Sequence, residues 1–348
     1  MLHAGAAVVL AAAPLCESLP LTRKPGSLIT LLSVGSILLA FFSILNGGAN
    51  AGEPSVPLSP GDHTIKLNYG ERDRSALIHV PPRAPEQQHL PVVFNFHGGG
   101  GHAANQQQYS LMDQLADRET FIVVYPNGTG RLEQRLLTWN AGTCCAYATL
   151  NNVDDVGFTI ALLKRLEEVI PIDRRRVYAT GMSNGAMMAY RLAAEVPQYF
   201  AAIAPVAGGM VVAEIQSSKA LPVMHFHSVD DPRALYHGGL GTPFPLTKSR
   251  VFHPDIDQMI AKWVDHDGCS KEAKIASRLV DDRRAQTATR FVYGSCRKNA
   301  EVVFWKLTGA GHVWPGGKQQ VMERILGPST DIIDANREMW NFFSRFKL

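Results

Sequence analysis

The chain has 348 residues, of which 46% are hydrophobic and 19% are charged, and its formal net charge is +3. A chain of this length and composition can bury a sizeable core within one principal α/β domain. Its lysines and arginines are scattered among carboxylates rather than gathered into a stripe, so nucleic acid is not expected as a partner.

An export signal is predicted at the N-terminus. Arg23 and Lys24 precede an apolar stretch over residues 28–45, which is followed by the small residues Ala49 and Ala51 around Asn50. This order is typical of a secretory signal peptide with cleavage after Ala51. A membrane anchor is the alternative, because the apolar run approaches the length that spans a bilayer.

The cleavage site favours a secreted protein, extracellular or periplasmic, with no stable membrane association after cleavage. Residues 1–22 form an unusual preface to a signal peptide, and one hypothesis is that translation begins further downstream. The predicted organisation is an N-terminal extension and signal peptide over 1–51, a short linker rich in Pro, Ser and Gly over 52–63, and a folded domain over 64–348.

Four cysteines follow the predicted cleavage site: Cys144, Cys145, Cys269 and Cys296. An even number in an exported chain suggests two disulfides, with three possible connectivities. Cys269 with Cys296 is the preferred pair, which leaves Cys144 and Cys145 as a strained adjacent pair or as free thiols. A zinc site is disfavoured because no C-x-x-C spacing is present.

Short β-rich runs alternate with helical ones along the domain. Strands are expected over 76–80, 92–96, 121–125, 177–180, 201–206, 223–227 and 302–307, and helices over 105–118, 155–169, 186–194 and 332–345. The strands are continuously apolar, as in a parallel sheet that is covered on both faces. The pattern predicts an α/β fold with a doubly wound, mostly parallel sheet and helices on both faces. In the last helix, Ile333, Met339, Trp340 and Phe343 are expected to be buried.

The pentapeptide Gly181-Met182-Ser183-Asn184-Gly185 lies between the strand over 177–180 and the helix over 186–194. Flanking glycines allow a sharp turn from strand to helix, which holds the serine exposed at the edge of the sheet. The helix N-terminus directs partial positive charge to the same point. The context favours Ser183 as a nucleophile over an ordinary strand-to-helix turn.

A serine nucleophile needs a histidine base and a carboxylate that orients it, in the chain order Ser, Asp, His for this arrangement. Asp230 and Asp231 follow the strand over 223–227, and His312 lies in a glycine-rich loop after the strand over 302–307. His312 is the predicted base, and either aspartate could orient it.

Acyl transfer also needs donors for the developing oxyanion. His97 and four glycines over 98–101 follow the strand over 92–96, and unhindered glycine amides there can face the amide of Asn184. Gly99 and Asn184 are the predicted donors, with Gly98 as the alternative to Gly99. His97 is expected to support the loop by hydrogen bonding.

Six segments carry a family resemblance: HGGGG at 97–101, YPNG at 125–128, WNAGTCC at 139–145, VDDVGF at 153–158, GMSNGAMMAYRLA at 181–193 and GAGHVWPGG at 309–317. Together they resemble the poly(3-hydroxybutyrate) depolymerase and feruloyl esterase family of α/β-hydrolases, from about Thr64 to the C-terminus. The resemblance implies an α/β-hydrolase catalytic domain over 64–348 and a triad of Ser183, Asp231 and His312. The family's turn reads H-G-x-x-D-P-x-V-P-Y; the Asp-Pro step selects Asp231, but the missing glycine and second proline leave Asp230 open.

The expected reaction is hydrolysis of a carboxylic ester without a cofactor or metal. Polyhydroxybutyrate oligomers, feruloyl or acetyl esters of polysaccharides, and related small esters are the candidate substrates. Trp139 and Trp314 are predicted to line the substrate site, because one lies near Cys144 and the other follows His312 by two residues. Core packing accounts equally well for Trp139.

Two alternatives belong to other classes of function. His225 and His227 lie two apart on a strand and so point the same way, which with Asp230 and Asp231 would suit a metal-dependent hydrolase. The second alternative is a non-catalytic polysaccharide-binding protein that has kept a hydrolase fold.

Overall fold

The structure is a computed structural model that describes residues 58–82, 89–132, 135–243, 250–319 and 322–348. All of these belong to one unit, Gly52–Leu348. The predicted signal peptide and residues 52–57 of the predicted linker lie outside the described residues. Strand β1 begins at Gly61, so residues 61–63 are part of a strand rather than of the linker. Within the described ranges, no helix combines the length and the apolar character that crossing a membrane requires.

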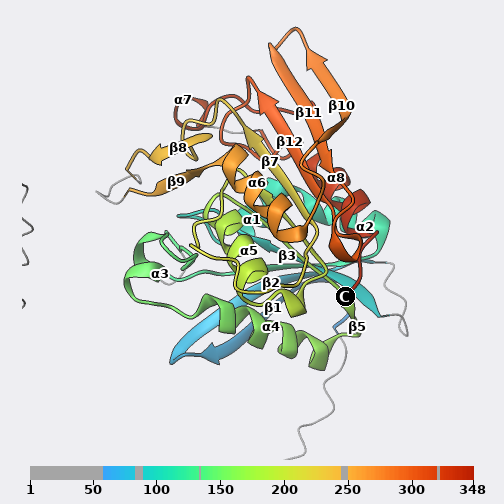
Figure 1. Cartoon of the computed structure of the whole chain (residues 1–348). Helices are drawn as coiled ribbons and strands as arrows, with labels where there is room; N and C mark the ends of the chain where they lie inside the picture. The colour runs from blue at the N-terminus through green and yellow to red at the C-terminus, as the bar shows by residue number, and fades with distance from the viewer. Residues whose placement is uncertain (1–57, 83–88, 133–134, 244–249, 320–321) are drawn as a thin grey trace, which may run out of the picture. The chain divides into compact units, whose positions relative to one another are not determined.

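A ten-stranded sheet runs through the domain (Figure 1). Its strands, from one edge to the other, are β1 (Gly61–Tyr69), β2 (Arg72–Val80), β4 (Ile122–Pro126), β3 (Leu90–Phe96), β5 (Ile172–Met182), β6 (Ala202–Val206), β7 (Val223–Ser228), β12 (Val302–Thr308), β11 (Gln286–Tyr293) and β10 (Lys274–Asp281). The strands from β4 to β12 in this order pair in parallel, and antiparallel hairpins extend both edges. The predicted α/β-hydrolase fold with a mostly parallel sheet is confirmed.

Helices cover both faces of the sheet, and the alternation of side chains along each strand decides what they contact. Val92 and Phe94 on β3 pack with α4 (Asp155–Val169), α5 (Asn184–Glu195) and α6 (Ile256–Asp267) on one face. Val93, between them, packs with α1 (Ala103–Ser110), α2 (Met112–Glu119) and α8 (Ala335–Phe343) on the other. Because both faces are covered, β3, β4, β6 and β7 are buried at every position, and most of their residues are apolar.

The predicted helix over 105–118 is instead two helices, α1 and α2, separated by Leu111 in the left-handed region with φ 56°. The carbonyl of Ser110 accepts a hydrogen bond from the Asn336 side chain at 2.7 Å, and the Ser110 hydroxyl accepts one from Asn95. These long-range bonds hold the end of α1 in the core. A local periodicity cannot reveal them.

The last helix, α8, is shorter than the predicted range 332–345, and one residue expected to be buried lies elsewhere. Ile333, Met339 and Phe343 are buried as predicted, but Trp340 is half-buried, and Phe342 takes the core position. Trp340 stacks on Phe121 and donates its indole N–H to the Glu119 carboxylate. The polar edge of the indole thus stays at the surface while its ring packs on the core.

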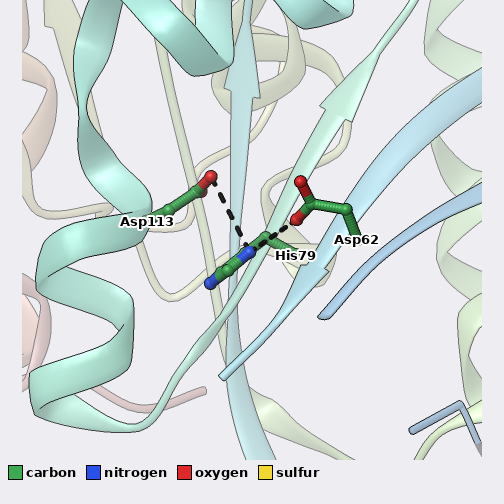
Figure 2. Close-up of side chains that lie close together, drawn as sticks. All are labelled: Asp62, His79 and Asp113. Carbon is green, nitrogen blue, oxygen red and sulfur yellow. Dashed lines mark hydrogen bonds and ion pairs between the residues drawn. The ribbon is translucent and has the colours of Figure 1, made fainter. Parts of the chain in front are cut away.

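A histidine among carboxylates ties the edge hairpin to α2. His79 on β2 contacts Asp62 on β1 through Nδ1 at 2.7 Å, and Asp113 Oδ2 lies 3.7 Å from the same nitrogen (Figure 2). Its Nε2 contacts Asp117 on α2 at 2.8 Å. Carboxylates accept hydrogen bonds, so both ring nitrogens donate and the ring is an imidazolium. Burial lowers the pKa of His79, but the hydrogen bonds to Asp117 and Asp62 outweigh it and raise the pKa above 6.5.

This imidazolium should make stability depend on pH. Because the folded-state pKa of His79 is raised, its contribution is fully present below the unfolded value of 6.5 and is lost as pH rises through the folded pKa. His79→Gln should therefore lower the free energy of unfolding most on the acid side of neutrality, by less than about 1 kcal/mol for each partly exposed pair, and the melting temperature should fall with it. Thermal unfolding of both proteins across neutral pH tests this, with His63→Gln as a control at a partly exposed histidine of β1. A difference that stays constant with pH would contradict it.

Candidate active site

Ser183 stands at the turn from β5 to α5. It has φ 55° and ψ −118°, a strained conformation for a residue with a side chain, and its N–H bonds the Val206 carbonyl at 2.9 Å. A Cβ built on Gly181 would lie 2.7 Å from the Phe96 carbonyl oxygen, and one on Gly185 would collide with the same atom. The pentapeptide therefore needs both glycines, because the turn presses against the end of β3. This is the geometry of a nucleophile elbow.

His312 and Asp231 meet beyond the carboxyl ends of adjacent parallel strands. β7 and β12 pair with Ser228 opposite Leu307, so the loops that follow them emerge at the same edge of the sheet. The Nδ1 atom of His312 lies 2.7 Å from Asp231 Oδ2. A carboxylate can only accept, so Nδ1 carries the proton and Nε2 is the unprotonated nitrogen of the ring.

The Asp231 carboxylate is buried and well supplied with donors. Its Oδ1 accepts the backbone N–H groups of Arg233 at 2.7 Å and Ala234 at 2.8 Å. Burial by itself would raise the pKa of Asp231, but the charge and hydrogen bond of His312 lower it below its usual value of 3.8. Asp231 is therefore ionised at neutral pH.

Asp230 points elsewhere. Its Oδ2 accepts the N–H of Gly309 at 2.7 Å, which ties the turn after β7 to the glycine-rich loop after β12. Of the two adjacent aspartates, the structure therefore brings Asp231 to His312 and gives Asp230 a loop-fixing contact.

Ser183 and His312 line one cavity of about 400 Å³. Gly98, Gly99 and Asn184 line it as well, and a Cβ built on Gly98 would lie 3.6 Å from that of Ser183. Much of the remaining wall is apolar, formed by side chains that include Met182, Met187, Val251, Met322, Ile325 and Leu326. The cavity thus joins an alcohol side chain, an imidazole and glycine amides to an apolar space.

His97 supports the glycine loop, as predicted. Its Nε2 accepts the N–H of Gly128 at 3.0 Å, so Nδ1 carries the proton and donates to the Gly98 carbonyl at 2.8 Å. Burial lowers the pKa of His97 to about 4, which keeps the ring neutral.

The prediction that Trp139 and Trp314 line the substrate site is wrong. Both are buried, at 0% and 2% exposure, and neither is part of the cavity wall. The Trp314 indole donates to Asn336 at 3.0 Å in the core, and that of Trp139 donates to the His97 carbonyl at 2.9 Å. Each indole N–H donates a hydrogen bond to a group inside the protein. A sequence pattern does not reveal these bonds.

The structure does not support the alternative of a metal site at His225 and His227, because their ring nitrogens are hydrogen-bonded to protein groups. His227 Nε2 donates to the Ala234 carbonyl at 2.7 Å, so its Nδ1 accepts from His225 Nε2 at 3.1 Å. Tyr190 then donates to His225 Nδ1 at 3.1 Å. The two imidazoles form a buried, neutral chain that Tyr190 begins, and burial lowers the pKa of each.

Several residues of the cavity wall were not predicted. Arg233, Thr242, His253 and Cys145 contribute to it. They lie in loops or on β9 (Phe252–Asp255), which pairs with β8 (His237–Leu240) away from the main sheet. Only Cys145 belongs to one of the recognised segments, WNAGTCC. Cys145 is joined to Cys144 and Cys269 to Cys296, so the preferred pairing of the sequence is present.

Residues 74–290 match the protein family described as esterase PHB depolymerase. The chain belongs to this family. The predicted resemblance is confirmed, and the protein is a carboxylic ester hydrolase. An esterase of this family is not expected to be a non-catalytic binder, so the second alternative is set aside.

Relatives at low identity carry esterase names. NocK of Nocardia uniformis subsp. tsuyamanensis, named as an esterase, is 27% identical over 74% of this chain and 75% of its own length. Feruloyl esterase B of Piromyces equi is 25% identical over 70% of this chain, and the bifunctional acetylxylan esterase/xylanase XynS20E of Neocallimastix patriciarum is 25% identical over 72%. The present chain covers 44% of the length of the Piromyces equi protein and 32% of the length of the Neocallimastix patriciarum protein.

A solved structure supports the fold. An acetyl xylan esterase from Aspergillus awamori matches 81% of this esterase and 99% of its own chain, with a TM-score of 0.54 at 16% identity. This likeness shows that the two chains share a fold.

Proposed function

We propose that this protein is a secreted serine esterase in which Ser183, His312 and Asp231 form a catalytic triad. The observation that carries the proposal is the shared cavity, in which the strained Ser183 and the Asp231-bound His312 face the same space. A catalytic triad is recognised by the geometry of its three side chains and by the role of each. Secretion rests on the predicted signal peptide over 1–51, and residues 64–348, with β1 from Gly61, would be the catalytic domain.

In the proposed mechanism, His312 Nε2 takes the proton of Ser183 as the hydroxyl oxygen attacks the ester carbonyl carbon. The resulting imidazolium is stabilised by the Asp231 carboxylate, and it then protonates the leaving alcohol. Water attacks the acyl-enzyme by the same route, and the acid leaves with Ser183 restored.

The oxyanion would be held by backbone amides. Asn184 N–H stands first in α5, where the helix dipole adds positive potential, and Gly99 or Gly98 would supply the second donor. The apolar wall suits an uncharged acyl or alcohol group. The names of the relatives support feruloyl and acetyl esters, and the family supports hydroxybutyrate oligomers.

A serine-directed phosphonate tests the proposal. The purified protein should lose hydrolysis of p-nitrophenyl acetate on treatment, and mass spectrometry should find the adduct on the peptide that contains Ser183. An adduct on another residue, or full activity after stoichiometric labelling of Ser183, would refute the triad. Methyl ferulate, acetylated xylan oligomers and hydroxybutyrate oligomers, assayed in parallel, would rank the substrates.

A further inference from the structure

Trp139 bridges two segments that are far apart in the sequence. Its indole N–H donates to the His97 carbonyl at 2.9 Å, in the loop after β3. Its backbone N–H donates to Asn184 Oδ1 at 2.8 Å, and its carbonyl accepts from Asn184 Nδ2 at 3.1 Å. The ring is fully buried and packs edge-on against Phe96 with centroids 5.2 Å apart. One residue therefore fixes the spacing between the glycine loop and the residue that follows Ser183.

These two segments carry the amides assigned to the oxyanion hole. Gly98 and Gly99 directly follow His97, and Asn184 supplies the amide next to Ser183. Stabilisation of an oxyanion depends on donors held within hydrogen-bond distance of the place where charge develops. The spacing that Trp139 sets is thus the spacing of the donors.

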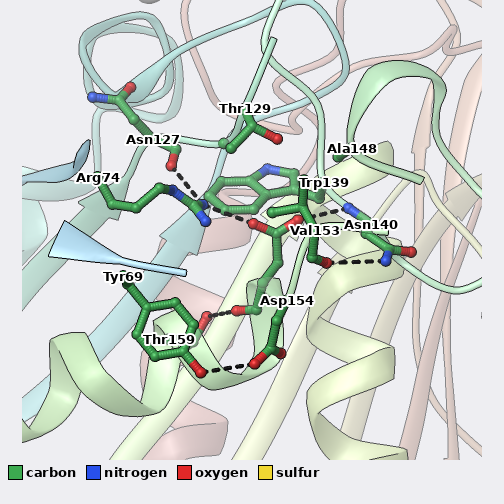
Figure 3. Close-up of polar contacts among 12 residues, drawn as sticks. Tyr69, Arg74, Asn127, Thr129, Trp139, Asn140, Ala148, Val153, Asp154 and Thr159 are labelled. Carbon is green, nitrogen blue, oxygen red and sulfur yellow. Dashed lines mark hydrogen bonds and ion pairs between the residues drawn. The ribbon is translucent and has the colours of Figure 1, made fainter. Parts of the chain in front are cut away.

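The bridge is anchored to the scaffold. Asn140 donates its backbone N–H to Asp155 Oδ2 at 2.8 Å and its side-chain amide to the Val153 carbonyl at 3.0 Å. Asp155 pairs with Arg74 at 2.7 Å in a fully buried ion pair, and Figure 3 shows the Trp139 ring beside this network. The Arg74 guanidinium also donates to the Asn127 carbonyl and lies 3.7 Å over the Phe158 ring. The contacts run to β2 and α4, so the bridge does not depend on a bound substrate.

We propose that Trp139 is a positioning residue of the oxyanion hole, which acts through its indole N–H and its paired contacts with Asn184. The proposal rests on the proposed serine-esterase mechanism. Trp139 does not line the cavity, so it should affect the transition state rather than ground-state binding.

Trp139→Phe, which keeps a ring but removes the N–H, tests the proposal. We expect kcat for p-nitrophenyl acetate to fall by roughly 10- to 100-fold, less than the loss of a direct donor, with KM changed by less than about threefold. Affinity for phenylboronic acid, which forms a tetrahedral adduct with the serine, should fall in parallel with kcat/KM. Stability alone would not produce that parallel.

Trp263→Phe is the matched control. Trp263 on α6 is also fully buried, but its indole N–H has no hydrogen-bond partner among the described residues, and it does not line the cavity. This variant should keep kcat and boronate affinity even if its melting temperature falls. Equal kinetic losses in both variants, or a rise in KM without loss of kcat in Trp139→Phe, would overturn the proposal.

A second variant covers the case in which Trp139→Phe does not fold. Asn184→Ala removes both side-chain contacts with Trp139 but keeps the backbone amide, and it should also lower kcat and boronate affinity together. Unchanged kinetics in Asn184→Ala would count against the bridge. Failure of the triad itself would be seen separately, as retained activity in Ser183→Ala.

Discussion

Ser183→Ala is expected to abolish ester hydrolysis, with a loss of kcat on the order of a million-fold, because it removes the hydroxyl that forms the acyl-enzyme in the proposed mechanism. The strained backbone at Ser183 is set by contacts around the turn rather than by its hydroxyl, so the variant should fold. Steady-state hydrolysis of p-nitrophenyl acetate, together with thermal unfolding, measures both expectations.

Ser270→Ala, at an exposed serine outside the cavity wall, is the control and should keep full activity. Retention of more than a trace of activity in folded Ser183→Ala would show that another group performs the reaction. The phosphonate adduct should be absent from Ser183→Ala and present in Ser270→Ala, which makes the labelling result an independent check.

The second large effect is expected at the carboxylate. Asp231→Asn should lower kcat by about four orders of magnitude, because an amide can donate to His312 Nδ1 and so favour the tautomer in which Nε2 carries the proton. Asp230→Asn should stay within a few-fold of the wild type, since the amide oxygen can still accept the N–H of Gly309. Kinetics of the two variants, measured side by side, distinguish these adjacent residues.

Comparable losses in both variants would mean that Asp230 and Asp231 act only through loop structure. A large loss in Asp230→Asn alone would reverse the assignment. The pair is well matched, because each substitution changes one oxygen to one amide nitrogen in neighbouring residues of the same turn.

The core of the fold could be predicted because each buried parallel strand gives a short run of apolar residues in the sequence. The turn at Ser183 could also be predicted, because the close approach of β3 requires glycines at 181 and 185 and both are visible in the sequence. By contrast, β10 is largely exposed and β11 is mostly half-buried, so neither shows the apolar run of a central strand. Helix α6 was overlooked although Ile256, Met259, Ile260 and Trp263 follow helical spacing.

The roles of individual site residues were harder to predict from the sequence than the fold. Asp230 and Asp231 are chemically identical, and only the direction of each side chain relative to His312 separates them. The position of Trp139 near Cys144 in the sequence predicts a residue of the cavity wall. Its hydrogen bonds to His97 and Asn184 join segments more than 40 residues away, and such contacts leave no local signal.

The apolar wall of the cavity has an evolutionary consequence. Val251 and the side chains of Met322, Ile325 and Leu326 come from segments that carry neither the serine nor its assigned oxyanion donors. Exchange of these side chains can reshape the space offered to an acyl or alcohol group while the backbone around Ser183 stays as it is. Substitutions in the wall can therefore change substrate preference without changing the residues around Ser183. Related esterases that share these residues can differ in the esters that they hydrolyse.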